Sequence, residues 1–290
     1  MTTPQENLAG KTGRPRRWIR VTVDSLVLLL LAAIVFDAYY YEPNHPQVEA
    51  YPFPTAKWPE GQKPIRVAQL SDLHLSSYGK REQRVIRALN ELNPEVVVMT
   101  GDYFGRKSYL PVMEKFLSQL PPAAIKIAVM GNVEHSLRIP PQAYEDLFAR
   151  FQVQLLINSK VYLQMGKARI CVVGLDDTSS GFYNPNLLHG LAPDDFNLVL
   201  AHSPEIFSLV RPNKTPNIDL ILTGHTHGGQ IRIPVLPAFW LPKDTDRYGR
   251  GFYRKYGVAM YLNRGIGTTV FPARFNCRPE IAVFELGAKP

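Results

Sequence analysis

The chain has 290 residues, of which 45% are hydrophobic and 20% are charged, and its formal net charge is +8. This composition is typical of a globular protein with one large or two small domains, and it excludes a largely disordered chain. Five basic residues and one acidic residue lie among the first twenty, so the remaining charge is diluted and we expect no nucleic-acid binding. Cys171 and Cys277 stand far apart, which predicts neither a disulfide framework nor a thiolate metal site.

The N-terminal segment RPRRWIR is followed by VTVDSLVLLLLAAIVFDAYYY, an apolar run that ends in tyrosines. Because a spanning helix needs about 20 residues, we predict a basic cytoplasmic tail over residues 1–20 and a transmembrane anchor over residues 21–41. Arginines before the helix and aromatic residues after it predict that the rest of the chain lies outside the cytoplasm. The alternative is a cleaved signal peptide, although no good small-x-small cleavage site follows and the paired arginines fit a twin-arginine signal only loosely.

Residues 42–64 are rich in proline and lack periodicity, which predicts an extended linker ahead of a globular domain over residues 65–290. The domain begins with the apolar strands IRVAQL, EVVVMT and IKIAVM, each followed by a helical pattern. This β-α-β-α-β order predicts a layered α/β fold. From about residue 153 the strands lie closer together and the tail is rich in strands, which predicts a hairpin or meander and a second sheet.

Polar side chains follow five apolar strands at the point where each strand stops, in the sequences SDLH, TGD, GN, AHS and TGHTH. Ligands of layered α/β folds bind beyond the carboxyl ends of strands, so we expect these side chains to meet at one edge. Side chains at i and i+2 of a strand point the same way, so His225 and His227 are predicted to face one target, as are Asp72 and His74. The predicted metal ligands are seven oxygen or nitrogen donors: Asp72, His74, Asp102, Asn132, His202, His225 and His227.

Seven ligands are too many for a single tetrahedral zinc ion, and they fit two divalent cations that share a carboxylate. The mixture of oxygen and nitrogen donors favours Mn²⁺, Fe or Zn²⁺ over Ca²⁺ or a metal that prefers thiolates. A pair of cations about 3.5–4 Å apart is suited to phosphoryl transfer, because it holds both the attacking and the leaving oxygen.

The ordered motifs DLH, GD, GN, H and GHTH resemble the calcineurin-like metallophosphoesterase superfamily. The segments GHTHGGQIRIP and NRGIGTTVFPARFNCRPE resemble its bacterial YaeI/YkuE-type phosphodiesterase branch. This resemblance implies a four-layer α-β-β-α sandwich of two mixed sheets behind a single transmembrane helix of the bacterial inner membrane, with a periplasmic domain. It implies one cation on Asp72, His74 and His227, a second on Asn132, His202 and His225, and a bridging Asp102. The implied reaction is attack of a metal-bridging hydroxide on phosphorus, with Asp102 and Asn132 as catalytic residues.

The third motif departs from the family pattern, in which a histidine directly follows GN, because Val133 occupies that place. We predict that His135 takes over the catalytic role, or that the leaving group departs without assistance. Glu134 is predicted to support a ligand histidine through a hydrogen bond. In the tail, Arg274 and Arg278 are candidates for binding substrate phosphate through paired N–H donors, and a structural or surface ion pair is the alternative for both.

The anchor predicts a phosphodiester or pyrophosphate substrate, either a small molecule or a lipid, at or near a membrane. A narrower alternative is UDP-2,3-diacylglucosamine pyrophosphatase of lipid A synthesis, an activity known in relatives of the superfamily. Its nucleotide leaving group suits the missing histidine, but its substrate lies on the cytoplasmic leaflet. An alternative from another class is a catalytically silent scaffold, although all seven predicted ligands are present.

Overall fold

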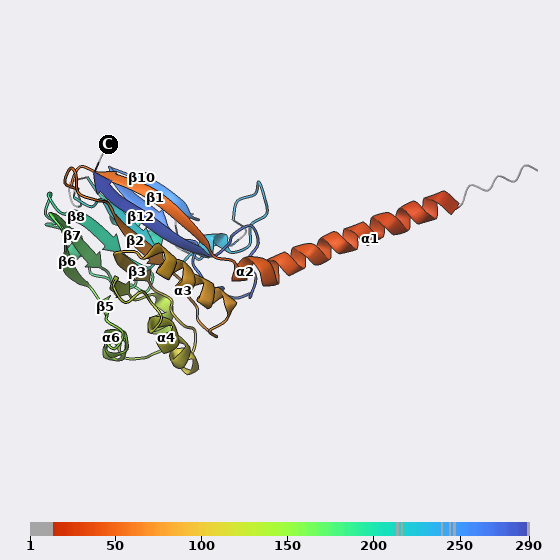
Figure 1. The fold of residues 1–290 in the computed structure, drawn as a ribbon, viewed down its shortest axis with the longest axis horizontal. Helices are drawn as coiled ribbons and strands as arrows, with labels where there is room; N and C mark the ends of the chain where they lie inside the picture. Colours follow the sequence, from red (N-terminus) through yellow and green to blue (C-terminus); the bar gives the residue numbers. More distant parts are fainter. Residues whose placement is uncertain are drawn as a thin grey trace, which may run out of the picture.

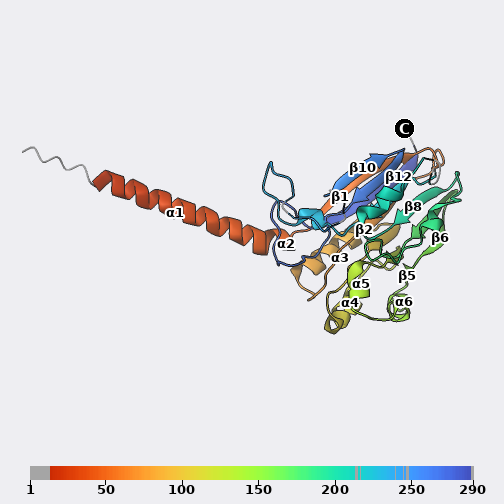
Figure 2. The same cartoon turned by 180° about the vertical axis from the view of Figure 1, so that it is seen from behind.

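A computed structural model describes residues 14–288 except 213, 214, 216, 239, 244, 246 and 247. Two six-stranded sheets pack face to face, and a long helix projects from one end of the domain (Figures 1 and 2). Both sheets are mixed, so the fold class implied by the resemblance is confirmed.

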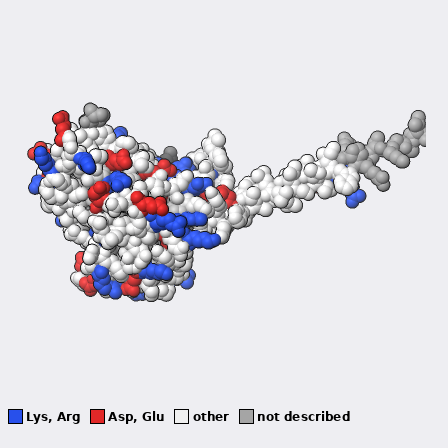
Figure 3. Space-filling model, viewed as in Figure 1, with Lys and Arg blue, Asp and Glu red and all other residues white. Residues whose placement is uncertain are grey.

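The N-terminal apolar run forms α1 (Arg14–Phe36), which continues through a π-helical turn (Asp37–Tyr41) into α2 (Glu42–Asn44). The stretch Arg17–Asn44 is long and apolar enough to cross a membrane, and its most apolar window is entirely unburied. Figure 3 shows this rod almost free of charged side chains over its length. A core helix of a soluble domain would bury such a surface, so its exposure favours a lipid environment.

The first sheet has the strand order β1-β12-β2-β3-β4-β5. Its central strands from β2 to β5 run parallel, whereas β12 is antiparallel to β2. The strands are β1 (Gln47–Thr55), β2 (Ile65–Leu70), β3 (Val96–Thr100), β4 (Ile125–Val129), β5 (Val153–Leu156) and β12 (Glu280–Ala288).

The prediction of a linker over residues 42–64 is wrong for residues 47–55, because these form β1. This strand pairs in parallel with β12 from Gln47 opposite Glu280 to Thr55 opposite Ala288. Its two prolines, which suggested a linker, are compatible with a strand at the edge of a sheet, where alternate N–H groups have no neighbour to bond. The globular domain therefore includes β1.

The second sheet has the strand order β10-β11-β9-β8-β7-β6, with hairpins at both edges and parallel strands between them. The hairpin predicted after residue 153 is β6–β7, whereas β5 belongs to the first sheet. The strands are β6 (Ser159–Met165), β7 (Ala168–Gly174), β8 (Phe196–Leu200), β9 (Leu220–Thr223), β10 (Gly251–Lys255) and β11 (Val258–Leu262).

Apolar side chains fill three layers of the domain. One layer lies between the sheets, where Val98 and Leu222 are both buried. A second lies between the first sheet and its helices, which are α3 (Lys80–Leu92), α4 (Leu110–Leu117), α5 (Asn132–Ser136) and α6 (Pro141–Ala149). The third lies under two 3₁₀ helices, Pro185–Leu188 and Pro204–Leu209, which cover the second sheet. These layers fix the positions of the strand ends that build the site.

Candidate metal centre

The strand ends bring the predicted ligands together from five loops. Asp72 and His74 follow β2, Asp102 follows β3, and Asn132 is the first residue of α5 behind β4. The remaining three histidines follow β8 and β9. Ligand atoms of six of these residues form two groups, each within 4.8 Å, which are Asp72, His74 and His227 on one side and Asp102, His202 and His225 on the other.

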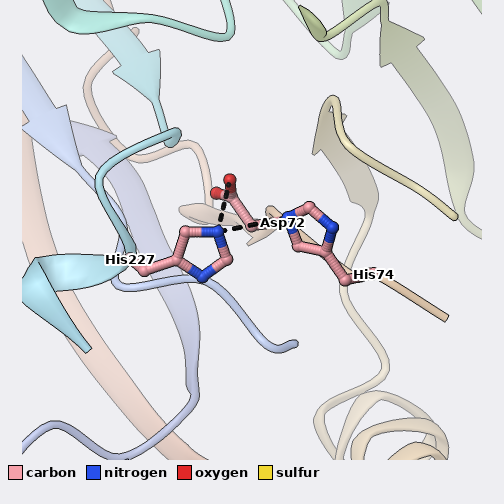
Figure 4. Close-up of side chains that lie close together, drawn as sticks. All are labelled: Asp72, His74 and His227. Atoms are coloured by element: carbon pink, nitrogen blue, oxygen red, sulfur yellow. Dashed lines mark hydrogen bonds and ion pairs between the residues drawn. The ribbon is translucent and has the colours of Figure 1, made fainter. Parts of the chain in front are cut away.

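In the first group, two imidazoles and a carboxylate converge (Figure 4). The Nε2 atoms of His74 and His227 are 3.1 Å apart, and Oδ1 of Asp72 lies 3.5 Å from Nε2 of His227. The Ser71 hydroxyl donates to the other carboxylate oxygen at 2.6 Å, which orients the Asp72 side chain. The composition of this group is the one implied by the resemblance.

The second group also combines imidazole nitrogens with oxygen donors. Nδ1 of His225 lies 3.0 Å from Nε2 of His202, and Oδ1 of Asn132 lies 3.0 Å from the same Nε2 atom. His202 is fully buried, and its Nδ1 donates to the Thr100 carbonyl at 2.8 Å. This bond leaves Nε2 free to act as a ligand, as in many metal-binding histidines.

Asp102 lies between the two groups. One of its carboxylate oxygens is 3.4 Å from Nε2 of His74 and the other is 3.4 Å from Nε2 of His202. The carboxylate is nearly fully buried and accepts a hydrogen bond from the Val133 backbone at 2.9 Å. A single side chain therefore faces both groups.

The prediction that His225 and His227 face one target is wrong, because each belongs to a different group. Neither residue lies in a strand, and both have left-handed backbone conformations with φ of 74° and 51°. Asp72, His74 and Asp102 share this feature, with φ between 39° and 58°. Such conformations are uncommon for residues with a side chain, and they concentrate at functional sites.

Close packing holds these turns in place. A side chain on Gly224 would bring its Cβ within 1.8 Å of the Ser71 hydroxyl and 2.3 Å of an Asp72 carboxylate oxygen. This approach lets the His225 N–H donate to the Asp72 carboxylate at 3.0 Å. The loop after β9 is thereby joined to the loop after β2.

Glu134 supports the centre differently from the prediction, because its carboxylate binds backbone N–H groups and no ligand histidine. It accepts hydrogen bonds of 2.9 Å from the N–H groups of Gly131, Asp102 and Tyr103. Burial and, second to it, the nearby Asp102 charge together raise the pKa of Glu134 to about 7. Glu134 thus ties the loop that carries Asp102 to the start of α5.

The charge balance of the two groups suits cations. Burial disfavours a charged His202, but the adjacent Asp102 carboxylate outweighs burial and raises the pKa of His202 well above its usual value. Burial, together with His74, lowers the pKa of His227 well below its usual value, so this imidazole stays neutral. The Asp102 carboxylate thus attracts positive charge at His202, and a bound cation would take the place of the His202 proton. Imidazole nitrogens and buried carboxylates that converge on common points are the donors divalent cations require, and the residues therefore fit a pair of metal ions.

His135 does not belong to either group. Its Nε2 lies 2.7 Å from Oδ1 of Asp176, and its ring stacks on Phe182 with centroids 4.3 Å apart. Asp176 was not predicted as a functional residue. The signal was present, because the sequence LDD directly follows β7, in the same way that the other site residues follow their strands.

Arg274 does not face a substrate site. It is fully buried, and its guanidinium donates to the backbone carbonyls of Gly267, Cys277 and Gly265 at 2.6 to 3.2 Å. Burial lowers the pKa of Arg274 to about 10, so it remains charged at neutral pH. We therefore correct the prediction that Arg274 binds substrate: it holds the tail segment in shape.

Arg278 also contacts the protein itself, because its guanidinium lies over the Tyr41 ring at 5.3 Å from the centroid. This places it at the foot of the N-terminal helix. Among the described residues, Arg278 belongs to neither metal group, and its predicted role in substrate binding remains a prediction.

A cleft of about 710 Å³ opens beside the first group. His74 lines it at one side, and Tyr39, Pro43 and Asn44 at the foot of the N-terminal helix line it at another. Arg81, Arg106 and Ser77 provide further polar lining. The cleft therefore connects the predicted metal centre with the end of the apolar helix.

Known proteins share this sequence and arrangement. Residues 65–229 match the sequence profile of the calcineurin-like phosphoesterases. The chain is 30% identical over 262 residues to the metallophosphoesterase YkuE of Bacillus subtilis, which covers 86% of this chain and 88% of that protein. It is 27% identical over 231 residues to the phosphodiesterase YaeI of Escherichia coli, and this match covers 77% of this chain and 82% of that protein.

A vertebrate relative has a similar domain. The chain is 29% identical over 271 residues to a transmembrane protein with a metallophosphoesterase domain from Danio rerio, which covers 88% of this chain and 61% of that protein. The profile match extends over more than half of the chain, and the matched range includes the strand-end residues that converge in the structure. The chain therefore belongs to the calcineurin-like metallophosphoesterase family.

Proposed function

We propose that this phosphoesterase is a dinuclear metal-dependent phosphodiesterase that acts at a membrane surface. The main support is the position of Asp102, whose two carboxylate oxygens each lie 3.4 Å from a histidine of a different group. A bridging carboxylate is what two adjacent cations require, and a single metal site would not need it. The name of the Escherichia coli relative, a phosphodiesterase, supports the substrate class.

When bound, two divalent cations would supply a water of lowered pKa as nucleophile and would stabilise negative charge on the phosphoryl oxygens. The first would be held by Asp72, His74 and His227, the second by Asn132, His202 and His225, and Asp102 would bridge them. Manganese, zinc and iron all suit this donor set. Asn132 and Asp102 thus position the reacting groups, and the buried hydrogen bond from His202 to Thr100 keeps its ligand nitrogen aimed at the centre.

His135 is the proposed proton donor to the leaving oxygen. Its partner Asp176 fixes the ring through the 2.7 Å contact at Nε2, which leaves Nδ1 as the atom that would carry the proton. The alternative is a leaving group that departs unaided, as a nucleotide phosphate would. This alternative suits UDP-2,3-diacylglucosamine pyrophosphatase activity, and a cytoplasmic domain would favour it.

The proposed location is the bacterial inner membrane, with one span and the domain on the periplasmic side. The exposed apolar helix supports a membrane attachment, and Arg17 and Arg20 at its far end favour the cytoplasm for that end. The vertebrate relative described as a transmembrane protein supports the attachment as well. A phosphodiester or pyrophosphate carried by a membrane component would be within reach of the cleft.

The test combines metal analysis with turnover of bis-p-nitrophenyl phosphate. We expect about two cations per chain, and we expect Asp102→Ala to lose metal and to lower kcat at least a hundredfold, roughly. Asp146→Ala, which removes an exposed carboxylate on α6, is the matched control and should retain both the metal content and the kcat of the unmodified chain. A chain that binds two cations but hydrolyses no diester would support the silent scaffold and overturn the proposal.

A further inference from the structure

An apolar groove of about 600 Å³ lies next to the cleft. None of the described residues that line it is charged, and these are Gly229, Gln230, Ile231, Ile233, Trp240, Thr269, Val270 and Phe271. Its volume is within the range of small-molecule sites in proteins. The proposed phosphodiesterase reaction makes no use of this groove.

The groove adjoins the cleft, because Thr269, Val270 and Phe271 line both. The two sides differ in character: Arg106 and the ion pair of Arg81 with Glu82 lie in the cleft, and the described lining of the groove is uncharged. One molecule with a phosphate at one end and a hydrocarbon at the other would match both. Such a molecule is an amphiphile with its phosphoester near His74.

The groove is built by specific hydrogen bonds. The buried Gln230 side chain donates to the carbonyls of Thr269 and Phe271 at 3.0 and 2.9 Å, and its oxygen accepts from the Thr269 N–H at 2.8 Å. Gln230 lies three residues after the predicted ligand His227, so the same short segment holds the metal group and the groove wall. This arrangement couples the position of the groove to the position of the site.

The apolar residues around the groove are unusually exposed for a domain in water. Val270 is 78% exposed, Phe271 58%, and Ile233 and Trp240 each 50%. Val270 also has a φ of 62°, which is strained for a β-branched residue and is maintained only when surrounding structure requires it. Exposed apolar patches of this kind mark sites for apolar partners.

The position of the groove indicates what that partner is. The cleft that it joins is lined by Tyr39, Pro43 and Asn44, where the apolar helix meets the domain. Figure 1 shows the loop after β9 beside the foot of this helix. Because the helix enters the bilayer from this end, lipids are the apolar molecules that the groove meets at the highest local concentration.

We propose that the apolar groove binds one acyl chain of a membrane lipid whose phosphodiester lies at the metal centre. The inference rests on the proposed function and assigns its substrate class. The acyl chain would add binding energy at a site remote from the reacting phosphorus. Hydrolysis would therefore depend on hydrocarbon length while the leaving group stays the same.

The test compares methyl and octyl p-nitrophenyl phosphodiesters below micellar concentration, with the full chain held in a fluorinated-tail surfactant and loaded with Mn²⁺. Burial of each methylene is worth roughly two- to fourfold in binding, so we expect kcat/KM for the octyl ester to exceed that for the methyl ester at least about thirtyfold. Ile233→Asn and Val270→Asn should reduce this ratio to within about threefold. Asparagine tolerates the left-handed conformation of Val270, which limits damage to the fold.

The matched control is Leu236→Asn. Leu236 is 54% exposed on the same loop and does not line the groove, so the octyl-to-methyl ratio should be unchanged. If Leu236→Asn lowers the ratio as much as Ile233→Asn does, the loop only inserts into lipid and the acyl-chain site is wrong. A wild-type ratio near one would also overturn it.

A binding measurement separates this inference from the proposed function. In a Trp18→Phe background, a brominated octylphosphonate should quench Trp240 emission with saturation, even when Asp102→Ala removes turnover. The same probe should have no such effect in the Trp18→Phe/Trp240→Phe variant. Absence of quenching would overturn the groove assignment, whereas quenching without hydrolysis of any diester would overturn the proposed function alone.

Discussion

Left-handed backbone conformations decide where the ligand side chains point. Five of the predicted ligands, among them Asp72 and His227, have φ between 39° and 74°. Each such residue turns the chain sharply, so His225 and His227 enter different groups although they are two positions apart, whereas Asp72 and His74 enter the same group. Conformations of this kind cost on the order of 1–3 kcal/mol each, and they persist because packing around them permits nothing else. Close contacts such as that of Gly224 with Ser71 thus hold the ligand turns in place.

The buried Arg274 leads to a prediction about stability. Arg274→Met should lower the free energy of unfolding by about 3 kcal/mol or more, because the carbonyls of Gly265 and Gly267 would lose buried donors. Arg278→Met, which removes a contact with the Tyr41 ring, should cost about 1 kcal/mol or less. Urea unfolding of both variants measures the difference. Unchanged stability of Arg274→Met together with a raised KM would restore its role in substrate binding.

His135 leads to a prediction about leaving groups. His135→Ala should lower kcat about a hundredfold for diesters with poor leaving groups and far less for good ones, because a general acid matters most when the leaving oxygen is basic. Asp176→Asn should show the same pattern more weakly, since Asp176 orients the ring. A series of aryl and alkyl leaving groups measures the slope, with the exposed His189→Ala as control. Equal loss across the series, or no loss, would remove His135 from the mechanism.

At the scale of elements, the strand β1 changes the boundary of the domain. It pairs with β12 along nine residues, and Tyr51 packs on Phe284 and Tyr261 of the sheets. Without β1, the long strand β12 would become an exposed sheet edge. Exposed edges are prone to pairing with other chains.

Truncation tests this boundary. A chain that begins at residue 37 loses the apolar helix but keeps Glu42, which accepts a hydrogen bond from Cys277, and should remain folded and monodisperse. A chain that begins at residue 57 loses β1 and should unfold at a lower temperature and aggregate. Thermal unfolding and size-exclusion chromatography distinguish the two. Equal stability would show that residues 47–55 act only as a linker.

At the scale of the whole molecule, the apolar helix, the cleft and the apolar groove lie at the same end of the domain. This arrangement directs the opening of the site toward the membrane to which the helix would attach. It also gives a role to Arg106 in the cleft, since the phosphates of membrane components are anionic.

The proposed topology is open to a direct measurement. A reporter fused to the C-terminus should be active only outside the cytoplasm, because the arginines precede the helix. Replacement of Arg17 and Arg20 by glutamate should reduce or reverse this orientation. A cytoplasmic reporter in the unmodified chain would contradict the proposed location and favour the lipid A pathway activity.

Most of the parallel strands and the seven predicted ligands can be predicted from the sequence. An apolar strand that ends at polar residues is recognisable within a short stretch of the chain, without knowledge of its tertiary contacts. The apolar N-terminal helix is local as well, since a run of apolar residues can be recognised without any tertiary partner. The linker prediction failed at β1 because Pro52 and Pro54 are acceptable only at an edge, and an edge is defined by the other strands. Asp176 was missed although its strand stops in the same way.

The sequence by itself therefore determined which chemical groups are present, in which order, and that they follow strands. Only the tertiary structure decided which backbone turns direct His225 and His227 into two groups, that Arg274 is buried, and that an apolar groove adjoins the cleft. The physical reason is that each of these depends on contacts between segments distant in sequence, such as Gly224 against Ser71. Local periodicity carries no information about such contacts.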